Sequence, residues 1–306
     1  MLVFGIPYFS LSAAHTFLEL PQWIDVLLQV MAGLVGAILH PDPRKAMVIG
    51  LGTGSSAGWL GAVPSIERVD TSELEPAMLH VARACAPVNH DVLDNPKVKI
   101  LLGDAREQLL VSRERYDLIF SEPSNPYRAG IASLFTDEYY QAAAQRLAEG
   151  GIFMQWVQGY EIDARTIKTI YATLARTFPN IETWELDLND LLLVATKAPM
   201  VHDVAQLREK LRGEPYKSAL SVAWGASDLE GFLAHYVARP SFARLVAERE
   251  EGRINTDDLT PIEFGFARTV GAATGVHGQP LRNLARERHE EHDEDHDGDP
   301  VGAGVR

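Results

Sequence analysis

Three glycines at alternate positions, Gly50, Gly52 and Gly54, are the most informative feature of this 306-residue sequence. They close an apolar run that begins at Ala46, and a segment with helical character begins at Ser55. Glycines at a strand-to-helix turn allow the main chain to approach a flat or charged ligand, and the N-terminus of a helix offers N–H donors. Because tight turns also require glycine, this spacing alone leaves a purely structural role open.

The carboxylate of Glu73 supports a ligand-binding role for the glycine loop. Glu73 lies about 20 residues beyond the glycines and follows a second strand-like run, residues 66–71. Nucleotide-binding folds use an acid at this place to accept hydrogen bonds from ribose hydroxyls. Together, the loop and Glu73 predict a pocket for an adenosine-type ligand.

Asp104 and Ala105 follow the third strand-like run and have two interpretations. A short carboxylate can accept a hydrogen bond from an adenine amino group while the small Ala105 leaves room for the ring. Asp104 can equally cap a helix that begins at Ala105. The two roles are compatible, and the sequence does not choose between them.

The fourth strand-like run ends at Ser121 and leads into the loop Glu122-Pro123-Ser124-Asn125-Pro126. The two prolines stiffen this loop, which holds the Glu122 carboxylate and the Asn125 amide near the place where a transferred group would sit. The alternative is a rigid turn whose polar side chains face water. Gln155, at the end of the fifth strand-like run, adds an amide either to the site or to the core.

The elements that must position these residues alternate between strand and helix. This alternation predicts a parallel sheet covered on both faces, with the ligand beyond the carboxyl ends of the strands. We therefore expect the glycine loop, Glu73, Asp104 and residues 121–127 to converge on one crevice. The predicted strands are 46–50, 66–71, 97–102, 116–121, 152–157, 181–187 and 190–196, and the predicted helices are 55–62, 75–85, 105–111, 136–148 and 163–178.

Capping residues mark two of these helices. Thr136, followed by two acids, predicts the start of helix 136–148, and Gly150-Gly151 predicts its end. Asp163 predicts a cap for helix 163–178, whose apolar residues recur at the spacing of one buried helix face.

Four regions are expected along the chain. Residues 1–40 form an N-terminal segment with a leading helix, 41–199 a nucleotide-binding domain, 200–275 a helical appendage, and 276–306 a disordered acidic tail rich in histidine. The apolar stretch Val26–Leu39 is shorter than the roughly 20 residues that span a bilayer, so a membrane partner is not expected. Met1–Tyr8 lacks the basic start of a secretory signal, so export is not expected either.

The composition narrows the partners and the compartment. A formal net charge of −14 argues against a nucleic-acid partner and is compatible with a small cationic substrate. Cys85 is the single cysteine, which excludes an intrachain disulfide and favours a reducing compartment such as the cytoplasm.

These motifs together resemble one family. Residues 40–196 are similar to the aminopropyltransferases, the spermidine synthase family, and most similar to the bacterial spermidine-synthase-like domains that also occur fused to membrane segments. The resemblance implies the fold of class I S-adenosylmethionine-dependent methyltransferases: a doubly wound, mostly parallel, seven-stranded α/β sheet that ends in an antiparallel strand. The matching runs are His40–Lys45 with Val48–Gly54, Glu73–Glu75, Gly103–Ala105, and Tyr116–Tyr140.

The same resemblance implies roles for the nucleotide half of the site. The loop of Gly50, Gly52 and Gly54 would contact the thioether or sulfonium part of the nucleotide. Glu73 would hold the ribose hydroxyls, and Asp104 with Ala105 would hold the adenine. Gln29 matches a family glutamine that precedes the first strand and borders the substrate pocket.

The acceptor half departs from the family at two positions. The family loop reads Asp-Ser-Ser-Asp-Pro, in which the first acid assists deprotonation of the attacking amine and the second helps to hold the polyamine. These positions are Glu122 and Asn125 here. By the same resemblance Glu122 is the catalytic candidate, and Ser121, Asn125 and Gln155 are the substrate-binding candidates.

The expected reaction is aminopropyl transfer from decarboxylated S-adenosylmethionine to a polyamine of the putrescine type, with release of methylthioadenosine and no metal. One alternative is methyl transfer from S-adenosylmethionine itself. Another is a catalytically degenerate nucleotide-binding module, which Asn125 and Leu28, in place of a family tyrosine, would accommodate. Relatives commonly form dimers, so a homodimer is a further expectation.

Overall fold

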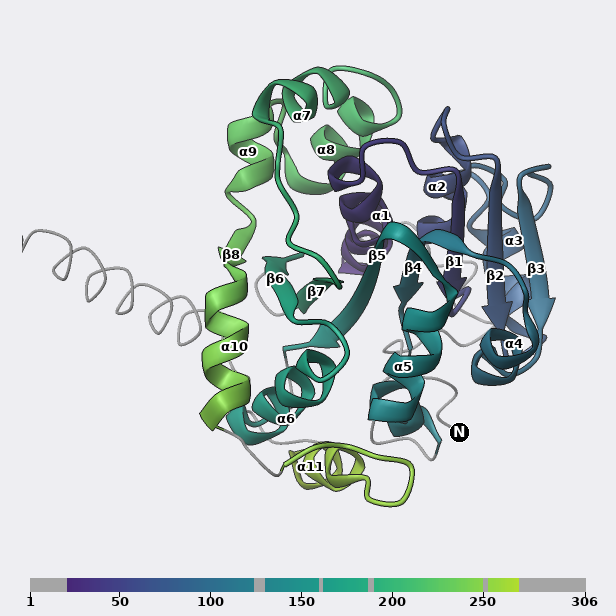
Figure 1. Cartoon of the computed structure of the whole chain (residues 1–306). Helices are drawn as coiled ribbons and strands as arrows, with labels where there is room; N and C mark the ends of the chain where they lie inside the picture. Colours follow the sequence, from purple (N-terminus) through teal and green to yellow (C-terminus); the bar gives the residue numbers. More distant parts are fainter. Residues whose placement is uncertain (1–20, 124–129, 160–161, 187–189, 250–252, 270–306) are drawn as a thin grey trace, which may run out of the picture.

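The computed structural model describes residues 21–123, 130–159, 162–186, 190–249 and 253–269. Its centre is a single eight-stranded sheet in the order β3-β2-β1-β4-β5-β7-β6-β8 (Figure 1). Strands β1 to β5 run parallel, and β7 lies antiparallel between β5 and β6. The strands are β1 (Lys45–Ile49), β2 (Arg68–Glu73), β3 (Val98–Leu102), β4 (Tyr116–Ser121), β5 (Leu147–Gln158), β6 (Asn180–Glu185), β7 (Asp190–Thr196) and β8 (Tyr236–Ala238).

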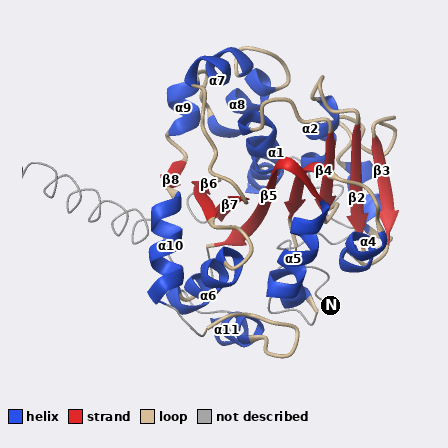
Figure 2. Cartoon of the chain, viewed as in Figure 1, coloured by secondary structure: helices blue, strands red, loops and turns tan. Residues whose placement is uncertain are grey.

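Helices cover both faces of this sheet (Figure 2). The first face carries α1 (Pro21–Leu39), α2 (Ser55–Ala62), α3 (Met78–Ala84), α7 (Val204–Lys210), α8 (Tyr216–Trp224) and α9 (Leu229–Leu233). The second face carries α4 (Ala105–Val111), the 3-10 helix η2 (Ile131–Phe135), α5 (Asp137–Arg146), α6 (Ala164–Ala175), α10 (Pro240–Arg249) and α11 (Pro261–Thr269). The predicted doubly wound, mostly parallel α/β fold is confirmed.

Alternation along each strand divides the apolar residues between two cores. In β4, Phe120 packs on the α1 face and Ile119 on the α5 face. In β5, Met154 packs on the α1 face and Phe153 on the α5 face. Because both faces of these central strands are buried, their sequences are continuous apolar runs. The same alternation decides which polar residue at each strand end reaches which face.

Local capping signals set the helix starts as predicted. The Asp163 carboxylate accepts a hydrogen bond from the Thr166 N–H at 2.7 Å at the start of α6, and the Thr136 hydroxyl accepts one from the Tyr139 N–H at 3.3 Å at the start of α5. The predicted end of α5 is wrong. The helix stops at Arg146 and β5 begins in the next residue, so Gly150-Gly151 lies within the strand.

The sheet departs from the expected seven strands in one respect. Strands β6 and β7 form the antiparallel pair that the family resemblance implies, and β8 then pairs with β6 as an additional edge strand. At three residues, β8 is too short to show a hydrophobic period. We did not predict it within the C-terminal region.

The C-terminal region is mainly helical, and it packs on both faces of the sheet. Helix α8 contacts α1 on the first face, whereas α10 and α11 contact α6 on the second (Figure 1). None of the helices in the described ranges combines the length and hydropathy of a membrane span. The expectations for the first 20 residues and for the tail 276–306 concern residues outside the described ranges.

Candidate active site

The carboxyl ends of β1, β2, β3 and β4 lie side by side. The register pairs Ile49 of β1 with Ser72 of β2 and with Ser121 of β4. Hydrogen bonds extend this alignment beyond the strands, because the Gly103 N–H donates to the Glu73 carbonyl at 2.9 Å. The loops that follow these four strands therefore meet at one edge of the sheet, where doubly wound folds bind ligands.

The glycine loop has a main chain that only glycine adopts readily. Gly50, Gly52 and Gly54 have φ values of +100°, +52° and +81°. A Cβ at Gly50 would lie 2.5 Å from the Glu122 carbonyl oxygen, so the loop also packs against the chain that leaves β4. Gly54 is the N-cap of α2 and provides no side-chain cap. The Ser55 N–H already donates to the Thr53 hydroxyl at 3.3 Å, so it is the other amides of the first turn of α2 that an anion or dipole could accept from.

Glu73 is fastened to this loop by both carboxylate oxygens. Its Oε2 accepts from the Leu51 N–H at 2.9 Å, and its Oε1 accepts from the Glu75 N–H at 2.8 Å. An ionised carboxylate has about four acceptor positions, so about two remain for ligand hydroxyls. The structure thus places Glu73 against the glycine loop, and its role in holding ribose hydroxyls stays a prediction.

Asp104 caps α4, and both bonds use the same oxygen. Its Oδ1 accepts from the Arg106 N–H at 2.7 Å and from the Glu107 N–H at 3.3 Å. Leu74 and Leu102, which follow Glu73 and precede Gly103, are 69% and 52% exposed. Such apolar side chains beside an exposed carboxylate suit the face and the edge of a purine ring. The capping role is observed, and the adenine role stays a prediction.

Gln29 lies over the glycine loop from α1. Its side-chain carbonyl accepts from the Thr53 hydroxyl, and its main-chain carbonyl accepts from the Ser56 hydroxyl at 3.0 Å. The structure therefore brings Gln29 to the glycine loop and the start of α2, and its place beside a substrate pocket stays a prediction. Thr53 and Ser56 were not singled out in the sequence, where a hydroxyl next to glycines has no distinctive pattern.

Glu122 follows β4 and contacts both the glycine loop and α2. Its N–H continues the pairing of β4 with β1 by donating to the Ile49 carbonyl at 2.9 Å. Its Oε2, at 2.8 Å, shares the single Ser56 hydroxyl hydrogen with the Gln29 main-chain carbonyl at 3.0 Å. Burial raises the pKa of Glu122 to about 8; the hydrogen bond from Ser56 opposes this, and the charge of Asp190 adds to it. A carboxylate with a pKa near neutrality can accept a proton from an amine and release it again.

Asp190 is a second acid of this site and was missed in the sequence. It is 7% exposed, begins β7, and pairs in register with Gln158 of β5. Its Oδ1 accepts from the Gly159 N–H at 3.4 Å. Asp190 and Glu122 both continue the α1-facing series of their strands, through Leu192 and Phe120 respectively. The first residue of an antiparallel strand belongs to the carboxyl edge of its neighbours, but this requires knowing that β7 is antiparallel.

Two predicted substrate residues lie on the other face. Ser121 and Gln155 follow the α5-facing residues Ile119 and Phe153 by two positions and are fully buried. The Gln155 Oε1 makes no hydrogen bond with the residues described, and the Ser121 hydroxyl interacts with the buried Tyr139 hydroxyl on the α5 face. The structure therefore does not bring their side chains to the face that carries Glu122. Asn125 lies outside the described residues.

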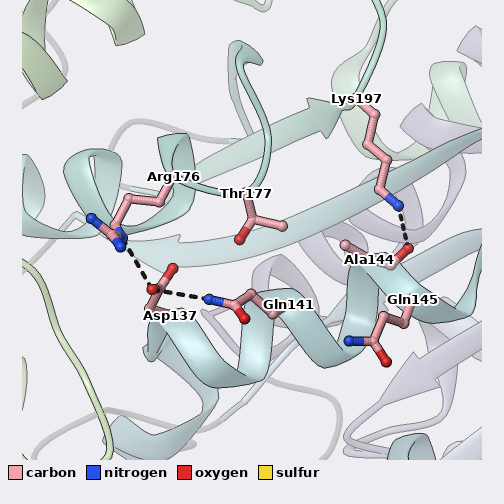
Figure 3. A pocket seen from close by; sticks show the side chains of 7 residues that line it. All are labelled: Asp137, Gln141, Ala144, Gln145, Arg176, Thr177 and Lys197. Atoms are coloured by element: carbon pink, nitrogen blue, oxygen red, sulfur yellow. Dashed lines mark hydrogen bonds and ion pairs between the residues drawn. The ribbon is translucent and has the colours of Figure 1, made fainter.

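A separate hollow of about 550 Å³ lies on the α5 face (Figure 3). Its charged groups are engaged within the protein: Asp137 accepts from Arg176 at 3.0 Å and from Gln141 at 3.1 Å, and Lys197 donates to the Ala144 carbonyl at 2.7 Å. It includes none of the predicted site residues, and its open polar lining suits solvent better than a bound organic ligand. We assign the chemistry to the carboxyl edge of the sheet instead.

Comparison with known proteins agrees with this choice. The sequence model of the spermine/spermidine synthase domain matches residues 27–185, just over half of the chain. The polyamine aminopropyltransferase of Nitrosomonas europaea is 31% identical over 143 residues, which cover 46% of this chain and 44% of that protein. The corresponding protein of Thermotoga petrophila is 26% identical over 155 residues, covering 51% and 52%. The chain thus spans about half the length of the curated relatives that it matches.

Solved structures show the same fold. A spermidine synthase in complex with the transition-state analogue AdoDATO superimposes with a TM-score of 0.60 at 20% identity, over 74% of this chain and 77% of that one. The spermidine synthase of Thermotoga maritima gives a TM-score of 0.57 at 20% identity, over 74% and 76%.

Proposed function

Because this chain belongs to the spermine/spermidine synthase family, we propose that it transfers an aminopropyl group from decarboxylated S-adenosylmethionine to a polyamine of the putrescine type. The observation that carries this proposal is the hydrogen bond of 2.8 Å between Ser56 and Glu122. It joins the α2 end of the nucleotide loop to the one acid that follows β4. A donor held by the loop would therefore present its sulfonium side to that acid.

The nucleotide half of the proposed site follows from the bonds that position it. Glu73 would accept from the ribose hydroxyls with the lone pairs that Leu51 and Glu75 leave open. Asp104 would accept from the adenine amino group through Oδ2, since its capping bonds use Oδ1. The open turn of Gly50 to Gly54 would lie against the sulfur, where added side chains would clash.

The chemical step requires a neutral amine. An aliphatic amine has a pKa near that of lysine, about 10.4, so most of it arrives protonated at neutral pH. In the fraction of molecules in which it is ionised, Glu122 would take a proton from this ammonium, and the nitrogen would attack the methylene carbon next to the sulfonium. The new C–N bond forms as the C–S bond breaks, and methylthioadenosine leaves with the electron pair on sulfur. Holding donor and amine in one crevice supplies a large part of the acceleration.

Asp190 would attract the second cation of the acceptor. It shares a face with Glu122, and its charge adds to the rise in the pKa of that carboxyl. Two acids at one end of a crevice favour a dication over a monoamine. This would offset the charge that Asn125 lacks relative to the family loop.

The test is product formation by the purified chain. Decarboxylated S-adenosylmethionine is offered with a panel of diamines and monoamines, and methylthioadenosine and the elongated amine are quantified by mass spectrometry. We expect turnover with a diamine, and a loss of about 100-fold or more in Glu122→Gln but not in the matched surface variant Glu149→Gln. Full activity of Glu122→Gln would contradict the role of Glu122.

Two other results would each support a different function. Tighter binding of S-adenosylmethionine than of the decarboxylated donor in calorimetric titration would favour methyl transfer. No Lys or Arg occurs in residues 50–58 to receive the additional carboxylate, so we expect the opposite preference. Donor binding without product from any amine would identify a degenerate nucleotide-binding module.

A further inference from the structure

A segment that follows α10 crosses the α5 face and joins helices that are far apart in sequence. We call residues 253–260 the C-terminal strap. Its anchor is Asn255, which is fully buried. The Asn255 main chain accepts from the Asp137 N–H at 2.9 Å and donates to the Thr173 hydroxyl at 2.9 Å, and its side chain donates to the Ala132 carbonyl at 3.1 Å. These bonds tie the strap to η2, α5 and α6.

Two residues beyond this anchor, Asp257 reaches the N-terminus of α4. Both Asp257 oxygens accept from Arg106, with Nη1–Oδ1 at 2.7 Å and Nη2–Oδ2 at 2.6 Å. Arg106 also donates to the Ser133 carbonyl at 3.2 Å, and the Asp257 N–H donates to the Glu138 carboxylate at 3.1 Å. The Arg106 side chain is only 22% exposed. A bidentate, partly buried pair of this kind fixes orientation as well as distance.

Arg106 connects this ion pair to Asp104. Of the two capping hydrogen bonds to Asp104 Oδ1, the one from the Arg106 N–H is the shorter, at 2.7 Å. The guanidinium end of Arg106 is therefore held by the strap, while its main-chain end holds the carboxylate that would contact adenine. A rotation of the first turn of α4 would move Oδ1 and thereby turn Oδ2.

We propose that Asp257 is a positioning residue for base recognition, which acts through Arg106 to aim the Asp104 carboxylate at the exocyclic amino group of an adenine. This inference rests on the proposed nucleotide site. It assigns a role in that site to a residue that lies more than 70 positions beyond the segment matched by the family. The substrate class that it specifies is a 6-aminopurine nucleoside or its sulfonium derivative.

The test separates positioning from mere stability by using two ligands that differ in one amino group. Methylthioadenosine and its 6-deamino counterpart, with hydrogen in place of the amino group, are titrated calorimetrically into the full chain. A hydrogen bond from the amino group to a carboxylate corresponds to a preference of about 10- to 100-fold for methylthioadenosine in the unaltered protein. We expect Asp257→Asn to reduce this preference by about 5- to 10-fold while affinity for the deamino ligand changes less than about twofold.

A matched control and a second variant keep the inference refutable. Glu230→Gln removes an exposed bidentate partner of Arg208, at 2.9 and 2.5 Å, and we expect it to leave the preference unchanged. Arg106→Lys retains the positive charge but loses the pair of N–H donors that binds both oxygens of Asp257. We expect it to reduce the preference for methylthioadenosine as Asp257→Asn does.

Three results would overturn the inference in distinguishable ways. Equal weakening of both ligands by Asp257→Asn would show a structural role only, and an unchanged preference would show that the strap does not act on Asp104. Failure of the unaltered chain to bind either nucleoside would refute the proposed nucleotide site itself. Melting temperatures of all variants establish that the titrated proteins are folded.

Discussion

The strongest quantitative prediction concerns Glu122→Gln and the pH dependence of stability. Burial raises the pKa of Glu122 to about 8 in the folded chain, whereas its ordinary value is 4.5. Between these values the folded state holds a proton that the unfolded state has released. Stability therefore falls as pH rises through this interval, and the loss is complete above the folded pKa.

The magnitude follows from the two pKa values. At about 1.4 kcal/mol for each pKa unit, the upper bound of the loss is roughly 5 kcal/mol. Glu122 keeps part of its surface in solvent and accepts a hydrogen bond from Ser56, so we expect about 2 kcal/mol. Glutamine cannot ionise, and its amide oxygen can still accept from Ser56. The variant should match the wild type near pH 4 and exceed its stability by about 2 kcal/mol near pH 9.

Urea denaturation of both proteins across this pH range measures the effect. Glu230→Gln is the matched control, because Arg208 lowers the pKa of Glu230 to about 2 and the sign is reversed. The free energy of unfolding of Glu230→Gln should fall below that of the wild type once the pH exceeds the ordinary pKa of a glutamate carboxyl, 4.5. If Glu122→Gln were no more stable than the wild type near pH 9, the desolvated carboxylate on which the proposed base depends would be ruled out.

Four further predictions address the site and the frame around it. Glu73→Gln should weaken binding of methylthioadenosine about 10-fold by calorimetry, because a carboxylate accepts more strongly than an amide; unchanged affinity would remove Glu73 from the ribose site. Asp190→Asn should raise the KM for a diamine about 10-fold while kcat changes less than about threefold, and equal effects on a monoamine would contradict the role in binding a second cation. Gly58→Ala should cost about 3 kcal/mol in urea denaturation, because its Cβ would lie 1.8 Å from a main-chain carbonyl oxygen, whereas Gly213→Ala, at 3.5 Å from its nearest neighbour, should cost less than about 0.5 kcal/mol. Lys210→Met should lower the free energy of unfolding by about 2 kcal/mol, because Nζ donates to three carbonyls at the end of α1; a loss below about 0.5 kcal/mol would show that water replaces it.

Short-range features were readable from the sequence because the forces that set them act within a few residues. The glycine loop requires a left-handed main chain at Gly50 and Gly54, and an Asp or Thr cap satisfies amides two or three positions away. The error at the end of α5 has a similar origin. Gly150-Gly151 resembles a helix stop, but Leu147 already pairs with Tyr116 of β4, and regular pairing resumes at Ile152 after a shift in register.

Side-chain direction at the strand ends was harder to predict. Ser121 and Glu122 are neighbours in sequence, yet one faces α5 and the other faces α1. A loop motif assigns both to one site, whereas the pleat of the strand separates them. The resemblance placed Gln29 at the crevice, but only its bonds to Thr53 and Ser56 show how α1 forms that side of the site.

The sequence by itself determined the α/β class, the helix caps and the segments that end at one edge of the sheet, because each depends on local main-chain preferences and on the period of apolar residues. Only the tertiary structure decided that Asp190 lies on the same face of the sheet as Glu122 and that Asp257 reaches Arg106 across 151 positions. Both arrangements depend on sheet order and on a returning C-terminal segment. The contacts that fix them form only once the core is packed, and so they leave no periodic signal along the chain.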